Sequence, residues 1–216
     1  MPKGISTNKN CSSIAECLAR DFDFVIRYYC AGSSSKKMGI NEAKALCAAG
    51  LKLAAVYENN PTKIAYFNGN AGHADGVDAY HYAQLLHQPA GSAIYFTVDN
   101  DFSESQVAGP INDYFAGIVK GFKDAAVTQT AVYRIGVYGS GLCCEWLKAH
   151  NPAVELTWLA ESSGWSGSKN YGDWNLKQSF MKESVCGLKV DPRNPDNNDA
   201  ELNDSQGDFG DFSVPT

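Results

Sequence analysis

Two acidic residues at the end of an apolar segment are the strongest chemical signal in this sequence. Residues 92–101 read Ser-Ala-Ile-Tyr-Phe-Thr-Val-Asp-Asn-Asp, so Asp99 and Asp101 follow a β-branched and aromatic run. On a β-strand alternate residues face the same side, and Tyr95, Thr97 and both acids would share one face. Two carboxylates at close range raise the pKa of one and leave the other low. A glycosidase needs that division between proton donor and ionised partner; the simpler interpretation is a strand end that caps the next helix.

The charge of the chain is concentrated at its carboxyl end. Residues 191–216 contain seven acids and one base, so the net charge of −6 of the 216-residue chain resides in this acidic segment. The other residues carry balanced charges and no basic stripe, which argues against nucleic-acid binding. We interpret residues 1–216 as one domain with an acidic C-terminal segment.

Nothing in the sequence predicts a membrane anchor. No apolar run approaches the roughly 20 residues of a membrane-spanning helix, and the N-terminus has no apolar stretch of the signal-peptide type. The seven cysteines include no Cys-x-x-Cys pair, and Cys30 and Cys47 lie in apolar surroundings typical of small core residues. Disulfides are plausible if the protein works in the periplasm or outside the cell, a question that the sequence leaves open.

Strands and helices alternate along most of the chain, which predicts a parallel sheet with right-handed crossovers. Eight strands permit closure, so we expect an α/β fold of the (β/α)8 TIM-barrel type, irregular because its last three strands are joined mostly by loops. An open doubly wound sheet is the alternative. The expected strands are 4–7, 24–29, 51–57, 93–99, 134–138, 156–160, 174–180 and 185–190, and the expected helices are 12–20, 41–49, 75–88, 103–125 and 140–149.

In such a barrel the site lies at the carboxyl ends of the strands. These ends carry many acids, amides and aromatics, and sugar sites use carboxylates for chemistry, amides for hydroxyls and aromatic faces for pyranose rings. Glu161, beside two serines and a glycine, is interpreted as an exposed loop acid. The candidate site residues are Ser6, Arg27, Tyr28, Tyr57, Glu58, Asp99, Asp101, Tyr138, Trp158, Gln178 and Asp191.

An ordered set of motifs over nearly the whole chain resembles the glycoside-hydrolase-like domains of unknown function that are related to family 25 lysozymes. The resemblance implies a barrel with five βα units and helix-poor final strands. It also implies cleavage of the peptidoglycan glycan strand between N-acetylmuramic acid and N-acetylglucosamine. The motifs are Gly4-Ile-Ser-Thr, Val25-Ile-Arg-Tyr-Tyr, Ala55-Val-Tyr-Glu, Ile94-Tyr-Phe-Thr-Val-Asp-Asn-Asp, Ile135-Gly-Val-Tyr-Gly-Ser, Trp158-Leu-Ala and Trp174-Asn-Leu-Lys-Gln.

The chain departs from the related lysozymes at two acids. They carry Asp-x-Glu on the fourth strand and Asp at the end of the first, where this chain has Asp101 and Ser6. We predict a lysozyme-type glycoside hydrolase without metal or cofactor, in which Asp101 is the general acid and Asp99 the ionised partner. Glu58 is the second candidate for the acid. The predicted substrate-binding residues are Ser6, Arg27, Tyr28, Tyr57, Tyr138, Trp158, Gln178 and Asp191.

The partner that the resemblance implies is the glycan strand of bacterial peptidoglycan. It gives the protein an expected antibacterial, cell-wall-degrading role in the periplasm or outside the cell, with no insertion into a membrane. Because no signal peptide is recognisable, the chain is expected to be cytoplasmic before delivery by a secretion machine or phage-type release. An immunity or delivery protein is a candidate partner.

Three other functions stay open. A non-catalytic glycan-binding barrel is favoured by Ser6. A Cys/His amidase or peptidase is compatible with the seven cysteines and four histidines, because a catalytic pair need not be adjacent in sequence. A nucleotide-binding sheet is suggested by Gly136-Val-Tyr-Gly-Ser-Gly, although its glycine spacing differs from the dinucleotide fingerprint. His73, His81 and His87 lack the spacing of a helical metal site and are interpreted as surface or packing residues.

Overall fold

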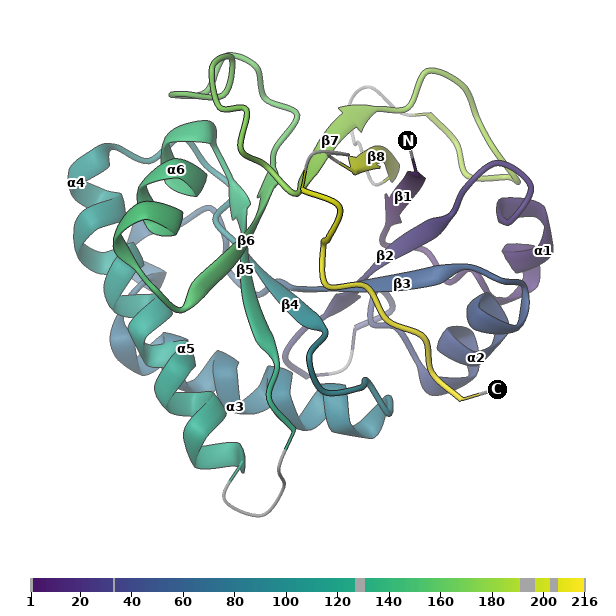
Figure 1. The fold of residues 1–216 in the computed structure, drawn as a ribbon, viewed down its shortest axis with the longest axis horizontal. Helices are drawn as coiled ribbons and strands as arrows, with labels where there is room; N and C mark the ends of the chain where they lie inside the picture. The colour runs from purple at the N-terminus through teal and green to yellow at the C-terminus, as the bar shows by residue number, and fades with distance from the viewer. Residues whose placement is uncertain (1, 33, 127–130, 191–196, 203–205, 216) are drawn as a thin grey trace.

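The computed structural model describes residues 2–32, 34–126, 131–190, 197–202 and 206–215. Helices follow each of the first five strands, as the sequence predicts (Figure 1). The strands are β1 (Lys3–Thr7), β2 (Phe24–Tyr29), β3 (Lys52–Tyr57), β4 (Ala93–Thr97), β5 (Arg134–Gly139), β6 (Val154–Leu159), β7 (Leu176–Phe180) and β8 (Asn197–Leu202). The helices are η1 (Ser12–Ile14), α1 (Ala15–Leu18), α2 (Ile40–Ala48), η2 (Ile64–Tyr66), α3 (Gly69–Leu85), α4 (Glu104–Gln106), η3 (Val107–Ile111), α5 (Asn112–Ala125) and α6 (Gly141–His150).

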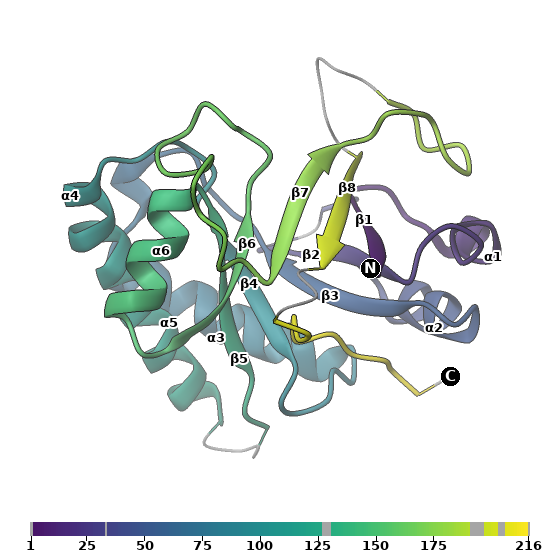
Figure 2. The same ribbon diagram turned by 45° about the horizontal axis from the view of Figure 1, so that its top comes forward.

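The strands form a curled sheet (Figure 2). Strands β1 to β7 run parallel, each paired with the next, and β8 pairs antiparallel with both β7 and β1. A parallel return needs a crossover, usually a helix, and the described residues between β7 and β8 contain none. The fold is therefore α/β and TIM-barrel-like. Its seven parallel strands form a curled half-barrel sheet, and the antiparallel β8 bridges the two edges of that sheet, which corrects the expected barrel of eight parallel strands.

The eighth strand lies at Asn197–Leu202, and the expectation of a strand beginning at Val185 was wrong. Val185 forms only an isolated antiparallel bridge with Leu188, because Cys186 (φ 52°) and Gly187 (φ 86°) turn the chain between them. The alternating apolar pattern of that segment belongs to a turn. Strand β8 itself reads Asn-Asn-Asp-Ala-Glu-Leu, and such polar residues are depleted in strands.

Helix α3 begins at Gly69, earlier than the predicted start at residue 75. The Asn68 side chain caps its first turn by accepting backbone N–H hydrogen bonds. Glycine lowers helix propensity, but here it permits close packing of α3 on α5. A Cβ atom on Gly72 would lie 1.9 Å from the carbonyl oxygen of Tyr114, so this helix contact requires glycine.

The single helix expected over 103–125 is divided into α4, η3 and α5. Ser103 caps α4 and forms a capping box with Gln106, as the sequence predicts. Gly109 then departs from helical geometry, with φ −98° and ψ −106°, and Pro110 follows. Proline lacks the backbone N–H and its ring clashes with the preceding turn, so the helix is interrupted at this point.

The two faces of the sheet pack in separate cores, because successive side chains of a strand point to opposite sides. Tyr28 on β2 pairs in register with Val56 on β3, and Val56 with Tyr95 on β4. These positions face the inside of the curled sheet. The alternate positions, such as Tyr29 and Tyr57, pack in the larger core that includes the helices. Figure 1 shows α3, α5 and α6 on one side of the molecule and α1 and α2 on the other.

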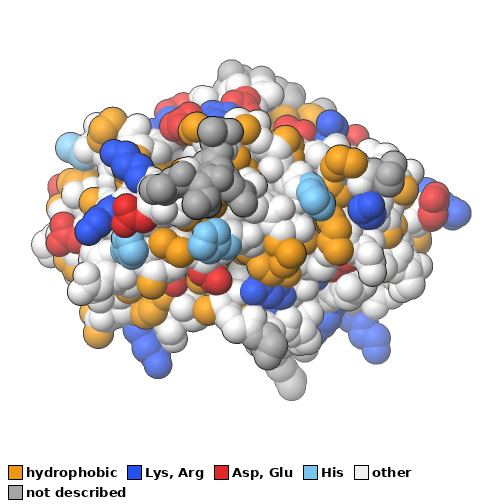
Figure 3. Space-filling model, turned by 90° about the horizontal axis from the view of Figure 1, so that it is seen from below, with side chains coloured by type: hydrophobic (Ala, Val, Ile, Leu, Met, Phe, Trp, Pro, Cys, Tyr) orange, Lys and Arg blue, Asp and Glu red, His pale blue; other side chains and the backbone are white. Residues whose placement is uncertain are grey.

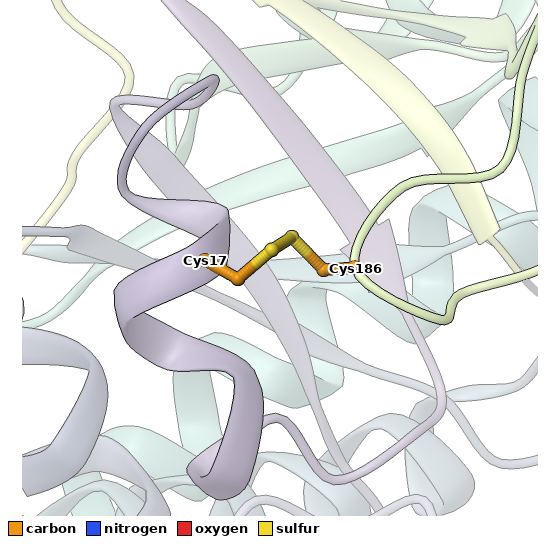
Figure 4. Close-up of a disulfide and its surroundings, with 2 residues drawn as sticks. All are labelled: Cys17 and Cys186. Atoms are coloured by element: carbon orange, nitrogen blue, oxygen red, sulfur yellow. A yellow bond between two sulfur atoms is a disulfide. The ribbon is translucent and has the colours of Figure 1, made fainter.

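A disulfide joins two segments 169 residues apart in the sequence (Figure 4). Cys17 on α1 bonds Cys186 in the segment after β7, with Cα atoms 5.8 Å apart. A crosslink over so long a loop restricts the unfolded chain and stabilises the fold by about 2–4 kcal/mol. Cys30 is buried and Cys47 is partly buried, in agreement with their interpretation as core residues.

The face at the amino ends of the parallel strands has a mixed charge. Lysine, arginine, aspartate and glutamate side chains are scattered over it, without a large patch of one sign (Figure 3). Within the described ranges, no helix combines the length and hydropathy needed to cross a membrane.

Candidate functional site

A cavity of about 210 Å³ lies at the carboxyl ends of the parallel strands. Pockets for whole small molecules usually hold about 300–1,000 Å³, so this cavity suits one unit of a longer ligand. Its walls come from the ends of strands β2 to β8 and from the segment between β6 and β7. The polar lining residues are Glu58, Thr97, Asp99, Glu161, Ser162, Gln178 and Asn198, and the apolar and aromatic ones are Tyr28, Val56, Tyr138, Trp158 and Phe180.

Asp99 stands just beyond β4 and is half-buried in the cavity wall. Its backbone N–H donates to the carbonyl oxygen of Pro61 at 2.9 Å, which fixes it against the β3–α3 connection. Burial raises the pKa of Asp99, the negative charge of Glu58 raises it further, and a hydrogen bond with Tyr138 acts in the opposite direction. Lost hydration and a like charge both disfavour the ionised form. Burial and the neighbouring negative charge therefore favour the protonated form of Asp99.

Glu58 follows β3 and has different surroundings. Its backbone N–H donates to the carbonyl oxygen of Tyr29 at 3.0 Å. Its carboxylate forms an ion pair with Lys36, whose Nζ also lies 5.3 Å from the ring centre of Tyr28. Glu58 and Asp99 therefore differ in their surroundings: Glu58 has a cationic partner, whereas Asp99 has the negative charge of Glu58 beside it.

The hydroxyl group of Tyr138 connects Asp99 to Gln178. Tyr138 Oη donates to Gln178 Oε1 at 2.9 Å and also hydrogen-bonds Asp99. A hydroxyl has one proton, so Tyr138 can donate it either to Gln178 or to the ionised Asp99, but not to both at once. Burial and then the charge of Asp99 raise the pKa of Tyr138, which keeps its own proton. The Tyr138 ring packs against Trp158, with ring centres 4.8 Å apart.

Asp101 does not share the cavity with Asp99. Its side chain is exposed, it does not line the cavity, and its Oδ1 accepts the backbone N–H of Ser166 at 2.8 Å. Strand β4 ends at Thr97, so strand alternation no longer controls the direction of residue 101. The structure therefore does not bring Asp101 beside Asp99, and the carboxylate that it brings near Asp99 in the cavity is that of Glu58.

Two predicted substrate-binding residues lie on the outer face of the sheet. Arg27 is fully buried and pairs with Glu42 on α2, with Nε and Oε1 2.7 Å apart. Tyr57 is also buried, and its hydroxyl donates to Asp78 Oδ2 on α3 at 3.0 Å. Both positions alternate with cavity-facing neighbours such as Tyr28, so neither lines the cavity.

The remaining predicted residues divide between the cavity and its surroundings. Tyr28, Tyr138, Trp158 and Gln178 line the cavity. Ser6 is buried in β1, but it does not line the cavity. Asp191 lies outside the described residues.

The structure also brings cavity residues together that sequence reasoning did not select. Strand alternation placed Thr97 on the face of Asp99, although Thr97 was not selected, and it could have found Phe180, which lies two residues from Gln178 on β7. Asn198 belongs to the strand that was placed wrongly. Glu161 is half-buried in the cavity wall, which corrects its interpretation as an exposed loop acid.

The free cysteines lie outside the cavity. Burial raises the pKa of Cys11 to about 11 and that of Cys144 to about 12, so both remain thiols at neutral pH. None of the five free cysteines lines the cavity. His73 is paired at the surface with Asp124, 2.8 Å away. In the part of the chain that the structure describes, no three His, Cys, Asp or Glu side chains gather as a metal site.

The fold and the carboxylate-lined cavity define a glycoside hydrolase-like protein of the TIM-barrel type. Residues 15–200 match the model of the Rv2525c-like, glycoside hydrolase-like domain. The chain therefore belongs to the Rv2525c-like, glycoside hydrolase-like domain family. The resemblance to glycoside-hydrolase-like domains related to family 25 lysozymes is confirmed.

One curated relative is the uncharacterized protein YbfG of Bacillus subtilis (strain 168). It is 31% identical over 145 residues, which cover 64% of this chain and 20% of that protein. The chain therefore corresponds to only about a fifth of the length of this relative.

Solved structures show the same fold. The Mycobacterium tuberculosis Tat-secreted protein Rv2525c, in complex with L-tartrate, has a TM-score of 0.70 at 20% identity and covers 97% of this chain and 98% of its own. GHIP of Streptococcus pneumoniae, a virulence factor and glycosyl hydrolase 25, has a TM-score of 0.59 at 12% identity over 94% of this chain and 87% of its own. The modular autolysin LytC of the same organism, with a synthetic peptidoglycan ligand, has a TM-score of 0.57 at 14% identity over 92% and 46%.

Proposed function

We propose that the protein is a glycoside hydrolase of the lysozyme type that cleaves the glycan strand of peptidoglycan. The observation that carries the proposal is the unequal pair of carboxyl groups in the cavity. Asp99 has a raised pKa, and Glu58 is paired with Lys36. Such a division of environments assigns one group as proton donor and the other as ionised partner.

Asp99 acts as the general acid in this proposal. Its proton passes to the glycosidic oxygen as the bond from that oxygen to the anomeric carbon breaks. Water then adds its oxygen to the anomeric carbon and gives a proton back to the Asp99 carboxylate. The negative charge of Glu58 stabilises the positive charge that develops on the sugar ring. Tyr28 and Trp158 pack on the ring, and the Gln178 amide binds its hydroxyl groups.

Peptidoglycan is proposed as the substrate on the basis of the relatives. The fold is that of the LytC autolysin, which has been crystallised with a synthetic peptidoglycan ligand, and of GHIP, a glycosyl hydrolase 25. A cavity of about 210 Å³ is smaller than most sites for whole small molecules and suits one sugar of a longer strand. Because the disulfide between Cys17 and Cys186 favours an oxidising compartment, we propose that the protein acts in the periplasm or outside the cell.

Mass analysis of purified peptidoglycan incubated with the protein tests this function. The expected products are glycan fragments with new reducing ends on N-acetylmuramic acid and with intact peptide stems. Fragments released by cleavage of amide bonds would contradict a glycosidase. Products that end in N-acetylglucosamine would still indicate a glycosidase, but one that cleaves the other glycosidic bond of the strand.

A non-catalytic glycan-binding protein is the second candidate, and Ser6 favours it. Ser6 stands where the related lysozymes carry an acid, and its side chain is buried away from the cavity lining. This candidate predicts saturable binding of peptidoglycan and no new reducing ends in the same incubation.

A further inference from the structure

Asp101 lies outside the cavity, but it helps to connect the segments that follow three strands of the sheet. Its Oδ1 accepts the backbone N–H of Ser166, in the segment that joins β6 to β7, at 2.8 Å. Its own backbone N–H donates to Asn100 Oδ1 at 2.9 Å, and Asn100 Nδ2 donates to the carbonyl oxygen of Thr62 at 3.2 Å. The connections that follow β3, β4 and β6 are therefore linked through residues 100 and 101.

The segment between β6 and β7 is also held by the start of α6. The N–H of Leu142 donates to the carbonyl oxygen of Ser166 at 2.9 Å, and the N–H of Gly141 donates to Ser168 Oγ at 3.0 Å. The two backbones touch at Gly167, where a Cβ atom on Gly141 would lie 2.3 Å from the Gly167 carbonyl carbon. A segment rich in Gly and Ser, flexible by composition, is thus clamped between Asp101 and α6.

The clamped segment presents Glu161 to the cavity. Glu161 and Ser162 line the wall, and the backbone N–H of Glu161 donates to Gln178 Oε1 at 3.3 Å. Trp165, further along the segment, packs against the core inside the curled sheet. The hydrogen bond from Ser166 to Asp101 therefore lies a few residues from a carboxylate that lines the cavity.

We propose that Asp101 is a positioning residue, which holds residues 161–173 so that Glu161 supplies the third carboxylate of the cavity to the bound glycan. Glu161 accepts hydrogen bonds from sugar hydroxyls, and Asp101 does not touch the substrate. The effect of this arrangement on hydrolysis rests on the proposed function, whereas the hold on the segment does not.

Two substitutions of Asp101 separate positioning from acid catalysis. Asp101→Asn keeps an oxygen that accepts the Ser166 N–H but cannot act as an acid, and Asp101→Ala loses both. We expect kcat/KM on peptidoglycan to stay within about twofold of wild type in Asp101→Asn and to fall about ten- to a hundredfold in Asp101→Ala. Glu104→Ala, which removes an exposed carboxylate at the start of α4, is the matched control and should keep the wild-type value.

Hydrogen exchange of the Ser166 amide gives a readout that does not depend on hydrolysis. It should be slow in the wild type and in Asp101→Asn, and faster in Asp101→Ala. An Asp101→Asn variant as inactive as Asp101→Ala would overturn the proposal in favour of acid catalysis by Asp101, and unchanged exchange in Asp101→Ala would overturn it outright. If the wild type releases no reducing ends, the proposed function fails, and the exchange rates still decide whether Asp101 holds the segment.

Discussion

Charged groups are buried on both faces of the curled sheet, but their surroundings differ. On the outer face, Arg27 and Glu42 are 0% and 1% exposed and make two hydrogen bonds to each other, at 2.7 and 3.2 Å. Glu42 also accepts the backbone N–H of Cys11 at 2.8 Å. On the inner face, the carboxyl group of Asp99 has the like charge of Glu58 nearby and borders an open cavity.

This difference teaches that burial of a charge does not by itself mark a functional site. A buried pair whose hydrogen bonds are all made within the protein is a structural element that is costly to break. A carboxyl group with a raised pKa instead ionises less readily in the folded protein than it would in water. Such groups gather at active sites. On this comparison we assign Arg27 and Glu42 to the stability of the fold and propose a chemical role for Asp99.

The largest expected effect comes from Asp99→Asn. Asparagine keeps the size of the side chain but cannot deliver a proton, so the rate of reducing-end release from peptidoglycan should fall about 10²–10⁴-fold. Asp113→Asn, at an exposed acid of α5, is the control and should keep the wild-type rate. Wild-type activity in Asp99→Asn would show that Asp99 is not the general acid.

Arg27→Met should have its effect on stability. It leaves the Glu42 charge buried without its partner, and the free energy of unfolding in urea should fall by about 3–5 kcal/mol. The folded fraction should retain its kcat/KM, because Arg27 does not line the cavity. Lys52→Met breaks an exposed pair, Lys52 with Asp211 at 4.0 Å, and should cost less than about 1 kcal/mol. If Arg27→Met lost as little free energy of unfolding as Lys52→Met, the contrast between the two faces of the sheet would not hold.

Glu58→Gln should move the pH–rate profile. The negative charge of Glu58 raises the pKa of Asp99, so its removal lowers that pKa. A general acid works in its protonated form, and activity is lost as the pH rises through its pKa. The alkaline limb of the profile should therefore move to lower pH. If the alkaline limb stays in place or moves to higher pH, Glu58 does not raise the pKa of the general acid.

Phe180→Ala should have the smallest effect. Phe180 lines the cavity although it is 54% exposed, and an aromatic ring so placed can pack on a sugar. Its removal should raise KM about three- to tenfold with little change in kcat. Leu85→Ala, at a side chain that is 64% exposed on α3, is the matched control. An unchanged KM in Phe180→Ala would remove this residue from the binding surface.

Strand alternation accounts for much of what the sequence could predict and for part of what was missed. Applied to the segment before Asp99, it placed that residue beside Thr97 on the inner face. The same rule applied to the second strand would have separated Tyr28, in the cavity, from Arg27, outside it. It failed at Asp101 because the strand had already ended, and strand ends are the least certain part of a sequence-based prediction.

Other features depend on contacts between distant segments. The polar composition of β8 does not predict a strand. The segment is a strand because it pairs with β7 and β1. The partner of Ser166 is Asp101, 65 residues away, and composition alone suggests an exposed loop around Glu161. Likewise the glycines of α3 lower its local helix propensity but permit its contact with α5.

The central claim is that Asp99 is the protonated carboxyl group of the cavity and acts as the general acid. Carbon-13 NMR of the side-chain carboxyl groups, followed through a pH titration of the folded protein and assigned with Asp99→Asn, measures its pKa directly. We predict a pKa above the ordinary value of 3.8 for Asp99 in the wild type and a lower one in Glu58→Gln. A pKa at or below 3.8 in the wild type would contradict the assignment of Asp99 as the general acid.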